Sequence, residues 1–109
     1  MREADFISML TILQEKRFGV AIKTPEKENI TAVLAGKVIH VNYEIGNTYS
    51  IMVQHDNYLS LYRNVLKPLK NVGDVVVAGE SLAIATEEPL WFELWQNGYA
   101  INPEEVIAF

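Results

Sequence analysis

The chain has 109 residues, of which half are hydrophobic and 21% are charged, and its formal net charge is −5. This length supports one globular domain with a single core. The absence of cysteine excludes disulfide scaffolds and thiol-based metal or catalytic sites, and the acidic balance argues against nucleic-acid binding. With only two histidines, His40 and His55, the chain is poor in groups that carry out chemistry.

The first predicted element is a short amphipathic helix within residues 4–16. Four apolar side chains recur there at helical spacing, namely Phe6, Met9, Leu10 and Leu13. The stretch is too short to span a membrane and lacks the basic flank of a signal peptide, so we expect neither feature in this chain.

After this helix the pattern changes to short segments rich in β-branched and aromatic residues, separated by glycine and asparagine. The predicted strands are Ile30–Ala35, Lys37–Tyr43, Tyr49–His55, Tyr58–Arg63, Val75–Val77, Leu82–Thr86 and Trp91–Gln96. No helix-length segment separates them. We therefore expect a mostly β sandwich or barrel in residues 17–109, preceded by the helical segment in residues 1–16.

The two histidines are weak candidates for a metal site. His40 and His55 fall on different predicted strands, and neither lies in a typical zinc spacing such as H-x-H or H-E-x-x-H. His55 and Asp56 are neighbours whose side chains point to opposite faces of a strand, which makes a poor catalytic dyad. From these residues we expect no metal site, no cofactor and no catalytic residue in this chain.

The segment from Trp91 to Trp95 is more informative. Strand alternation sends Phe92 and Leu94 to the core, and both tryptophans and Glu93 to the opposite face. Two tryptophans around a carboxylate form either a second packed layer or an exposed binding strip, since large aromatic side chains are favoured binding anchors.

Four stretches of the chain stand out in order along the sequence, namely Phe18–Ile22 with Thr24–Glu26 and Ile30–Val38, Tyr49–Val65, Val72–Glu80, and Leu90–Pro103. As an ordered set they resemble the LytM/lysostaphin-type zinc endopeptidase domain. The segment Val72–Glu80 alone also resembles biotinyl and lipoyl domains. The resemblance implies a duplicated hybrid motif, also described as a barrel-sandwich hybrid, over residues 17–109.

The departures from the family pattern decide the expected function. The family takes zinc ligands and catalytic histidines from H-x-G-x-D, L-Y-x-H and H-x-H motifs, and the corresponding residues here are Arg17, Ala21, Asn64, Pro89 and Trp91. Arginine stays protonated, and alanine and proline have no side-chain donor atom, so these residues cannot replace the zinc ligands. The resemblance therefore implies an inactive homologue without metal or cofactor.

Degenerate domains of this type include activators of peptidoglycan amidases. The resemblance thus implies a non-catalytic module of the bacterial cell envelope that binds a peptidoglycan hydrolase or peptidoglycan. The former substrate groove would be lined by Tyr62, Trp91, Glu93 and Trp95. Residues 71–109 carry seven acids and no base, which indicates either a solvated face or a docking surface for a basic partner.

Three alternatives come from other classes. A purely structural module would have its groove closed by packing, for example by Ala4–Lys16. A lipoyl or biotinyl carrier would need a lysine at a hairpin tip, a setting that Lys37, Lys67 and Lys70 do not have. A cryptic hydrolase would have to use His55.

Overall fold

The computed structural model describes residues 19–23 and 27–103, which form strands and turns in one antiparallel sheet system. The strands are β1 Val20–Ile22, β2 Asn29–Thr31, β3 Gly36–Glu44, β4 Thr48–Gln54, β5 Leu59–Pro68, β6 Val75–Val76, β7 Ser81–Ala85, β8 Leu90–Gln96 and β9 Tyr99–Ile101. The helix predicted within residues 4–16 lies outside the described residues.

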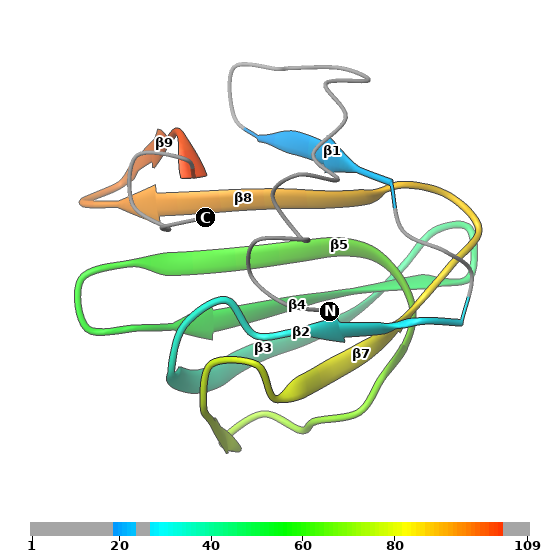
Figure 1. Cartoon of the computed structure of the whole chain (residues 1–109), viewed down its shortest axis with the longest axis horizontal. Coiled ribbons are helices and arrows are strands. Elements are labelled where there is room, and N and C mark those ends of the chain that lie inside the picture. The colour runs from blue at the N-terminus through cyan, green and yellow to red at the C-terminus, as the bar shows by residue number, and fades with distance from the viewer. Residues whose placement is uncertain (1–18, 24–26, 104–109) are drawn as a thin grey trace.

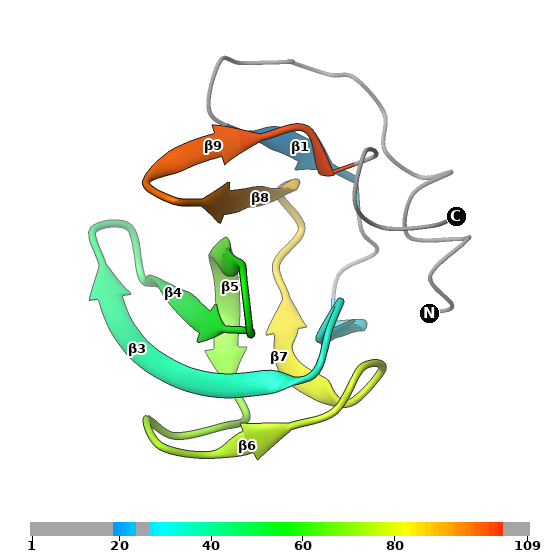
Figure 2. The same ribbon diagram turned by 90° about the vertical axis from the view of Figure 1, so that its left-hand side faces the viewer.

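The strands are ordered β1-β8-β5-β4-β3-β6, with β9 on β8 and with β2 joined through β7 to β5. In Figure 1, β1, β8 and β5 run side by side in the upper half of the view, and β2 and β7 lie below them. Figure 2 shows β3 and β6 on one side of the core and β8, β9 and β1 on the opposite side. The mostly β fold predicted from the sequence is confirmed.

Strand β5 joins the two parts of this sheet because it bends at Asn64. Its first half, Leu59–Arg63, pairs with β8, and its second half, Val65–Pro68, pairs with β7. The register against β4 shifts between Arg63 and Val65, and Asn64 has a φ of 69°. A bulge of this kind bends a strand and re-aims its side chain, and asparagine adopts a positive φ more readily than most residues.

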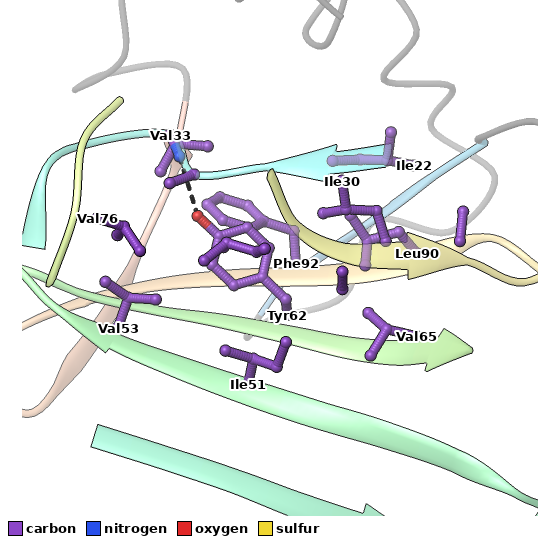
Figure 3. Close-up of a cluster of buried hydrophobic side chains, with 14 of the residues drawn as sticks. Ile22, Ile30, Val33, Ile51, Val53, Tyr62, Val65, Val76, Leu90 and Phe92 are labelled. Atoms are coloured by element: carbon purple, nitrogen blue, oxygen red, sulfur yellow. Dashed lines mark hydrogen bonds between the residues drawn. The ribbon is translucent and has the colours of Figure 1, made fainter. Parts of the chain in front are cut away.

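The core lies between these layers and is centred on two aromatic rings. Tyr62 and Phe92 are fully buried, and their ring centroids lie 5.2 Å apart in an edge-on arrangement. Figure 3 shows aliphatic side chains around them and the hydrogen bond of 3.1 Å that the backbone N–H of Val33 donates to the Tyr62 hydroxyl. Burial raises the pKa of Tyr62 to about 12, so the hydroxyl stays protonated.

The first predicted strand is shorter than expected. The prediction for Ile30–Ala35 holds only to Thr31, where β2 ends. Beyond this point the backbone donors find partners outside the ladder, because the N–H of Ala32 bonds to the carbonyl of Glu80 and that of Val33 bonds to Tyr62. The chain therefore turns over the core instead of continuing along β7.

Candidate functional site

Strand β8 presents two different faces. Phe92 and Leu94 are fully buried in the core, and Trp91, Glu93 and Trp95 lie on the opposite face. The same face extends onto the neighbouring strands, because Trp91 pairs directly with Arg63 of β5 and with Ala21 of β1. The predicted alternation holds for the two core residues Phe92 and Leu94, whereas Glu93 on the opposite face is buried as well.

The carboxylate of Glu93 is held between the two indole rings. Its Oε2 accepts a hydrogen bond of 2.5 Å from Nε1 of Trp91, and its Oε1 accepts one of 2.8 Å from Nε1 of Trp95. The side chain is buried, with 8% of the residue exposed. Hydrogen bonds to an ionised acceptor are stronger than neutral ones, so this contact fixes the orientation of both rings.

A groove of about 600 Å³ opens at the Trp91 end of β8. One wall is the β3–β4 turn, and the other is formed by β5 and β8. Its lining residues are Glu44, Ile45, Thr48, Arg63, Asn64, Trp91 and Glu93. Ile45 is fully exposed at the tip of the turn, and Nε of Arg63 lies 3.1 Å from Oε1 of Glu44. The groove therefore combines apolar surface with both signs of charge.

The structure brings together four of the five positions that the resemblance singled out. Ala21 of β1 pairs directly with Trp91 of β8. Nδ2 of Asn64 donates a hydrogen bond of 2.9 Å to the carbonyl oxygen of Pro89. Asn64 and Trp91 both line the groove. The fifth position, Arg17, lies outside the described residues.

Gly19 explains how β1 approaches β8 so closely at this point. A Cβ atom added there would lie 2.7 Å from Cγ of Glu93 and 2.8 Å from both Cζ2 of Trp91 and the carbonyl oxygen of Phe92. Real Cβ atoms essentially never come that close to other heavy atoms. A glycine at this position therefore permits the packing of the chain against the Trp91 ring.

The donor atoms at these positions do not fit zinc. The zinc ions of proteins are bound by His nitrogen, Cys sulfur or carboxylate oxygen. Ala21 and Pro89 offer no side-chain donor atom, and the indole nitrogen of Trp91 is a hydrogen-bond donor only. Among the residues that the structure describes, no group of three or more His, Cys, Asp or Glu side chains could hold a metal ion.

The two histidines lie away from the groove. His40 is exposed on β3, and His55 is buried after β4. Nδ1 of His55 donates a hydrogen bond of 2.7 Å to the carbonyl oxygen of Ala35, and Nε2 lies 2.8 Å from the hydroxyl of Ser60. Burial lowers the pKa of His55, against the opposing effects of the Ala35 carbonyl and the Asp56 charge. His55 therefore connects the segment before β3 to β5 through its two ring nitrogens.

The expectation that Tyr62 lines the groove is wrong. Its side chain points into the core, where it is fully buried beside Phe92. The reason is the pairing of Tyr62 with Phe92 across β5 and β8, which places both residues on the inner face. Of the other predicted groove residues, Trp91 and Glu93 line the groove, and Trp95 lines a second hollow at the far end of β8.

Sequence reasoning missed four of the groove residues, namely Arg63 of β5 and three residues beside the β3–β4 turn. Glu44, Ile45 and Thr48 surround the β3–β4 turn, where Gly46 and Asn47 have φ values of 97° and 64°. The turn itself was predictable from glycine and asparagine. The isoleucine in this turn was the available signal, because glycine, proline and polar residues dominate turns and a large apolar side chain there is unusual.

Comparisons with known proteins agree with this fold. The family profile described as "Peptidase family M23" matches residues 15–103. No curated protein sequence matches the chain. Among the described residues, no helix has the length and the apolar character needed to span a membrane.

Several solved structures are similar. A zinc-containing peptidase from Vibrio cholerae is 24% identical with a TM-score of 0.70, over 76% of this chain and 28% of that protein. The antimicrobial peptidase lysostaphin from Staphylococcus simulans is 19% identical with a TM-score of 0.71, over 84% and 43%. Csd3 from Helicobacter pylori is 17% identical with a TM-score of 0.78, over 88% and 28%. The chain thus spans less than half the length of these three relatives.

Proposed function

Because the chain belongs to peptidase family M23, we propose that it is a non-catalytic member of that family whose groove binds a peptide ligand in the bacterial cell envelope. The proposal rests on which residues occupy the groove. Ala21, Asn64, Pro89 and Trp91 lie together where the resemblance expects zinc ligands and catalytic histidines, and none of them is a histidine, cysteine or carboxylate of the kind that binds zinc in proteins. Zinc-activated water is the nucleophile that a metallopeptidase needs.

The groove retains features suited to binding. Trp91 supplies a large ring whose orientation is fixed by Glu93, and rigid aromatic side chains are favoured anchors in interfaces. The volume of about 600 Å³ lies within the range of ligand sites. These features support a binding role in place of hydrolysis.

The charges in the groove favour a ligand that carries both an ammonium and a carboxylate group. Arg63 and Glu44 form an ion pair, but such a pair on the surface contributes only ~0–1 kcal/mol. Little free energy is therefore lost when a ligand breaks this ion pair. The ligand can then place its carboxylate on Arg63 and its ammonium group on Glu44. A short peptide with both groups is such a ligand.

The stem peptide of peptidoglycan and an exposed segment of a peptidoglycan hydrolase are the two ligands that we propose. The first makes the domain a cell-wall binding module, and the second makes it a regulator of hydrolysis. Two of the similar structures are described as peptidases, one of them as antimicrobial, which is consistent with a place in the cell envelope.

Two parallel assays test this function. The first measures co-sedimentation of the chain with purified peptidoglycan sacculi, and the second measures whether the chain accelerates a purified peptidoglycan amidase. Trp91→Ala should reduce the positive signal by about tenfold, since a central aromatic anchor contributes 1–2 kcal/mol or more. The control is Tyr99→Ala, which removes an exposed aromatic side chain of β9 outside the groove.

Sedimentation or activation that depends on Trp91 but not on Tyr99 supports the proposal. If the chain neither binds sacculi nor alters the amidase, the proposed function is wrong. Equal loss in both variants also contradicts it, because the effect would then not come from the groove.

A further inference from the structure

A second hollow, of about 410 Å³, lies at the opposite end of β8 from the groove. It forms between the β4–β5 turn and the β8–β9 turn. Leu59 at the start of β5 pairs with Trp95 near the end of β8, so the two turns lie at the same end of the sheet. Figure 1 shows both turns at the left of the view.

The hollow is lined mainly by neutral polar and aromatic side chains. Its amide side chains are those of Gln54, Asn57, Gln96 and Asn97. Trp95 and Tyr58 contribute the rings. Among the described residues that line it, Asp56 is the one with a formal charge, and no lysine or arginine is present. A side-chain amide can both donate and accept hydrogen bonds, and Gln54, whose nitrogen donates to two backbone carbonyls, presents its amide oxygen.

The positions of several lining groups are fixed by the fold. Nε1 of Trp95 donates to Glu93, which sets the plane of the indole. Nε2 of Gln54 donates to the carbonyl oxygens of His55 and Tyr58 at 2.7 and 3.1 Å, which orients its amide oxygen. Asn97 has a φ of 53°, typical of a tight hairpin turn. These groups are therefore positioned before any ligand arrives.

We propose that this hollow binds a neutral saccharide. An anion would need a cationic partner, and a metal ion would need several carboxylate or histidine ligands, and the lining supplies neither. A saccharide presents hydroxyl groups that both donate and accept hydrogen bonds, and one face of its ring carries C–H groups that pack on an aromatic ring. Amides beside a tryptophan match that pattern, and the volume lies within the range of ligand sites.

A peptide fits the hollow less well. Extended peptides commonly bind by adding a strand to an open sheet edge. Here β4 pairs with β3 and β5, and β8 pairs with β5 on one side and with β1 and β9 on the other. The strands β4, β5 and β8 are therefore already paired on both sides at the hollow, so recognition by these three strands must come from side chains.

The site is separate from the groove of the proposed function, although both lie along β8. Trp91 and Trp95 are on one face of the strand and four residues apart, which corresponds to ~13 Å. The proposal rests only on the chemistry of the hollow. It therefore stands or falls independently of the peptide-binding role.

Titration of the isotope-labelled chain with soluble sugars, followed by nuclear magnetic resonance, tests the proposal. The probes are chitotetraose and cellotetraose, with tetraalanine as the peptide probe. We expect a sugar, and not tetraalanine, to shift the Nε1–H signal of Trp95 and the side-chain amide signals of Asn57 and Asn97. A response to the peptide alone, or to none of the probes, overturns the proposal.

A variant in which two lining asparagines are replaced tests where the saccharide binds. Asn57→Ala combined with Asn97→Gly deletes two lining amides and keeps the turn, because glycine accepts the positive φ at position 97. We expect the dissociation constant to rise by about tenfold. Asn42→Ala, which removes an exposed amide from β3 outside the hollow, should leave it unchanged. Equal affinity in the double variant and the wild type contradicts the assignment.

Discussion

The side-chain amide of Asn64 donates a hydrogen bond of 2.9 Å to the backbone carbonyl of Pro89. The resemblance assigns catalytic histidines to both positions, and we infer that a structural contact takes their place in this chain. The contact joins the bulge of β5 to the segment that enters β8. It stabilises the base of the groove without offering a group for proton transfer.

Substitution of Asn64 tests the structural role of this contact. Asn64→Ala should lower the free energy of unfolding by about 1–3 kcal/mol, because it removes the hydrogen bond and places an alanine at a φ of 69°. Asn64→Gly removes the same bond but accepts that φ, so its loss should be smaller by about 1 kcal/mol. Urea denaturation measures both values. Equal losses in the two variants would show that the bulge is not strained by alanine.

Removal of the Glu93 carboxylate should increase the mobility of both tryptophan side chains. Glu93→Ala leaves two indole N–H groups without their acceptor and should lower the free energy of unfolding by about 1–3 kcal/mol. Glu93→Gln keeps one acceptor oxygen and should have an intermediate effect. Urea denaturation combined with the indole N–H resonances checks this. Unchanged resonances in Glu93→Ala would contradict the role of the carboxylate.

His55 should make the fold sensitive to mild acid. Burial lowers its pKa in the folded state below the ordinary value of 6.5. Below pH 6.5 the unfolded chain therefore binds more protons at this site than the folded chain, and the free energy of unfolding falls as the pH decreases through that range. Above about pH 7 the contribution of this group is constant.

Denaturation series between pH 5 and pH 8 measure this dependence. His40→Gln changes an exposed residue of β3 and should keep the wild-type profile, and His55→Gln should flatten it. A profile that stays the same when His55 is replaced would assign the acid sensitivity to other groups.

Restoring the family ligands should restore zinc binding. Ala21 and Trp91 are direct cross-strand partners, whose Cβ atoms lie ~4.5–5.5 Å apart in such pairs. The triple variant Arg17→His, Ala21→Asp and Trp91→His should bind zinc at least about tenfold more tightly than the wild type by calorimetry. The double variant without Trp91→His is the matched control. Equal affinities in all three proteins would show that these positions do not converge on one site.

The sequence contained enough information to predict most strands but not every side-chain position. Alternation correctly placed Phe92 and Leu94 in the core, because β8 is regular from Leu90 to Gln96. It does not reveal which strand pairs with which, so the inward orientation of Tyr62 followed only from its register with Phe92. The family motif identified the positions of Asn64 and Pro89, whereas their mutual hydrogen bond depends on a bulge that no periodicity predicts.

The groove was harder to predict for a physical reason. Its walls come from segments far apart in the chain, such as Glu44 in β3 and Arg63 in β5, which meet only when β3, β4 and β5 pair. The separation of Trp91 and Trp95 into two hollows likewise depends on where neighbouring turns lie. Sequence pattern alone places both tryptophans on one face of the strand and does not separate them into two hollows.

A direct measurement of bound zinc tests whether this M23 domain lacks the metal chemistry of a peptidase. The purified chain is saturated with zinc, desalted and analysed by mass spectrometry for metal per protein, and the same sample is incubated with purified sacculi. We predict far less than one zinc ion per chain and no release of soluble wall fragments. A tightly held, stoichiometric zinc ion together with released fragments would contradict the account.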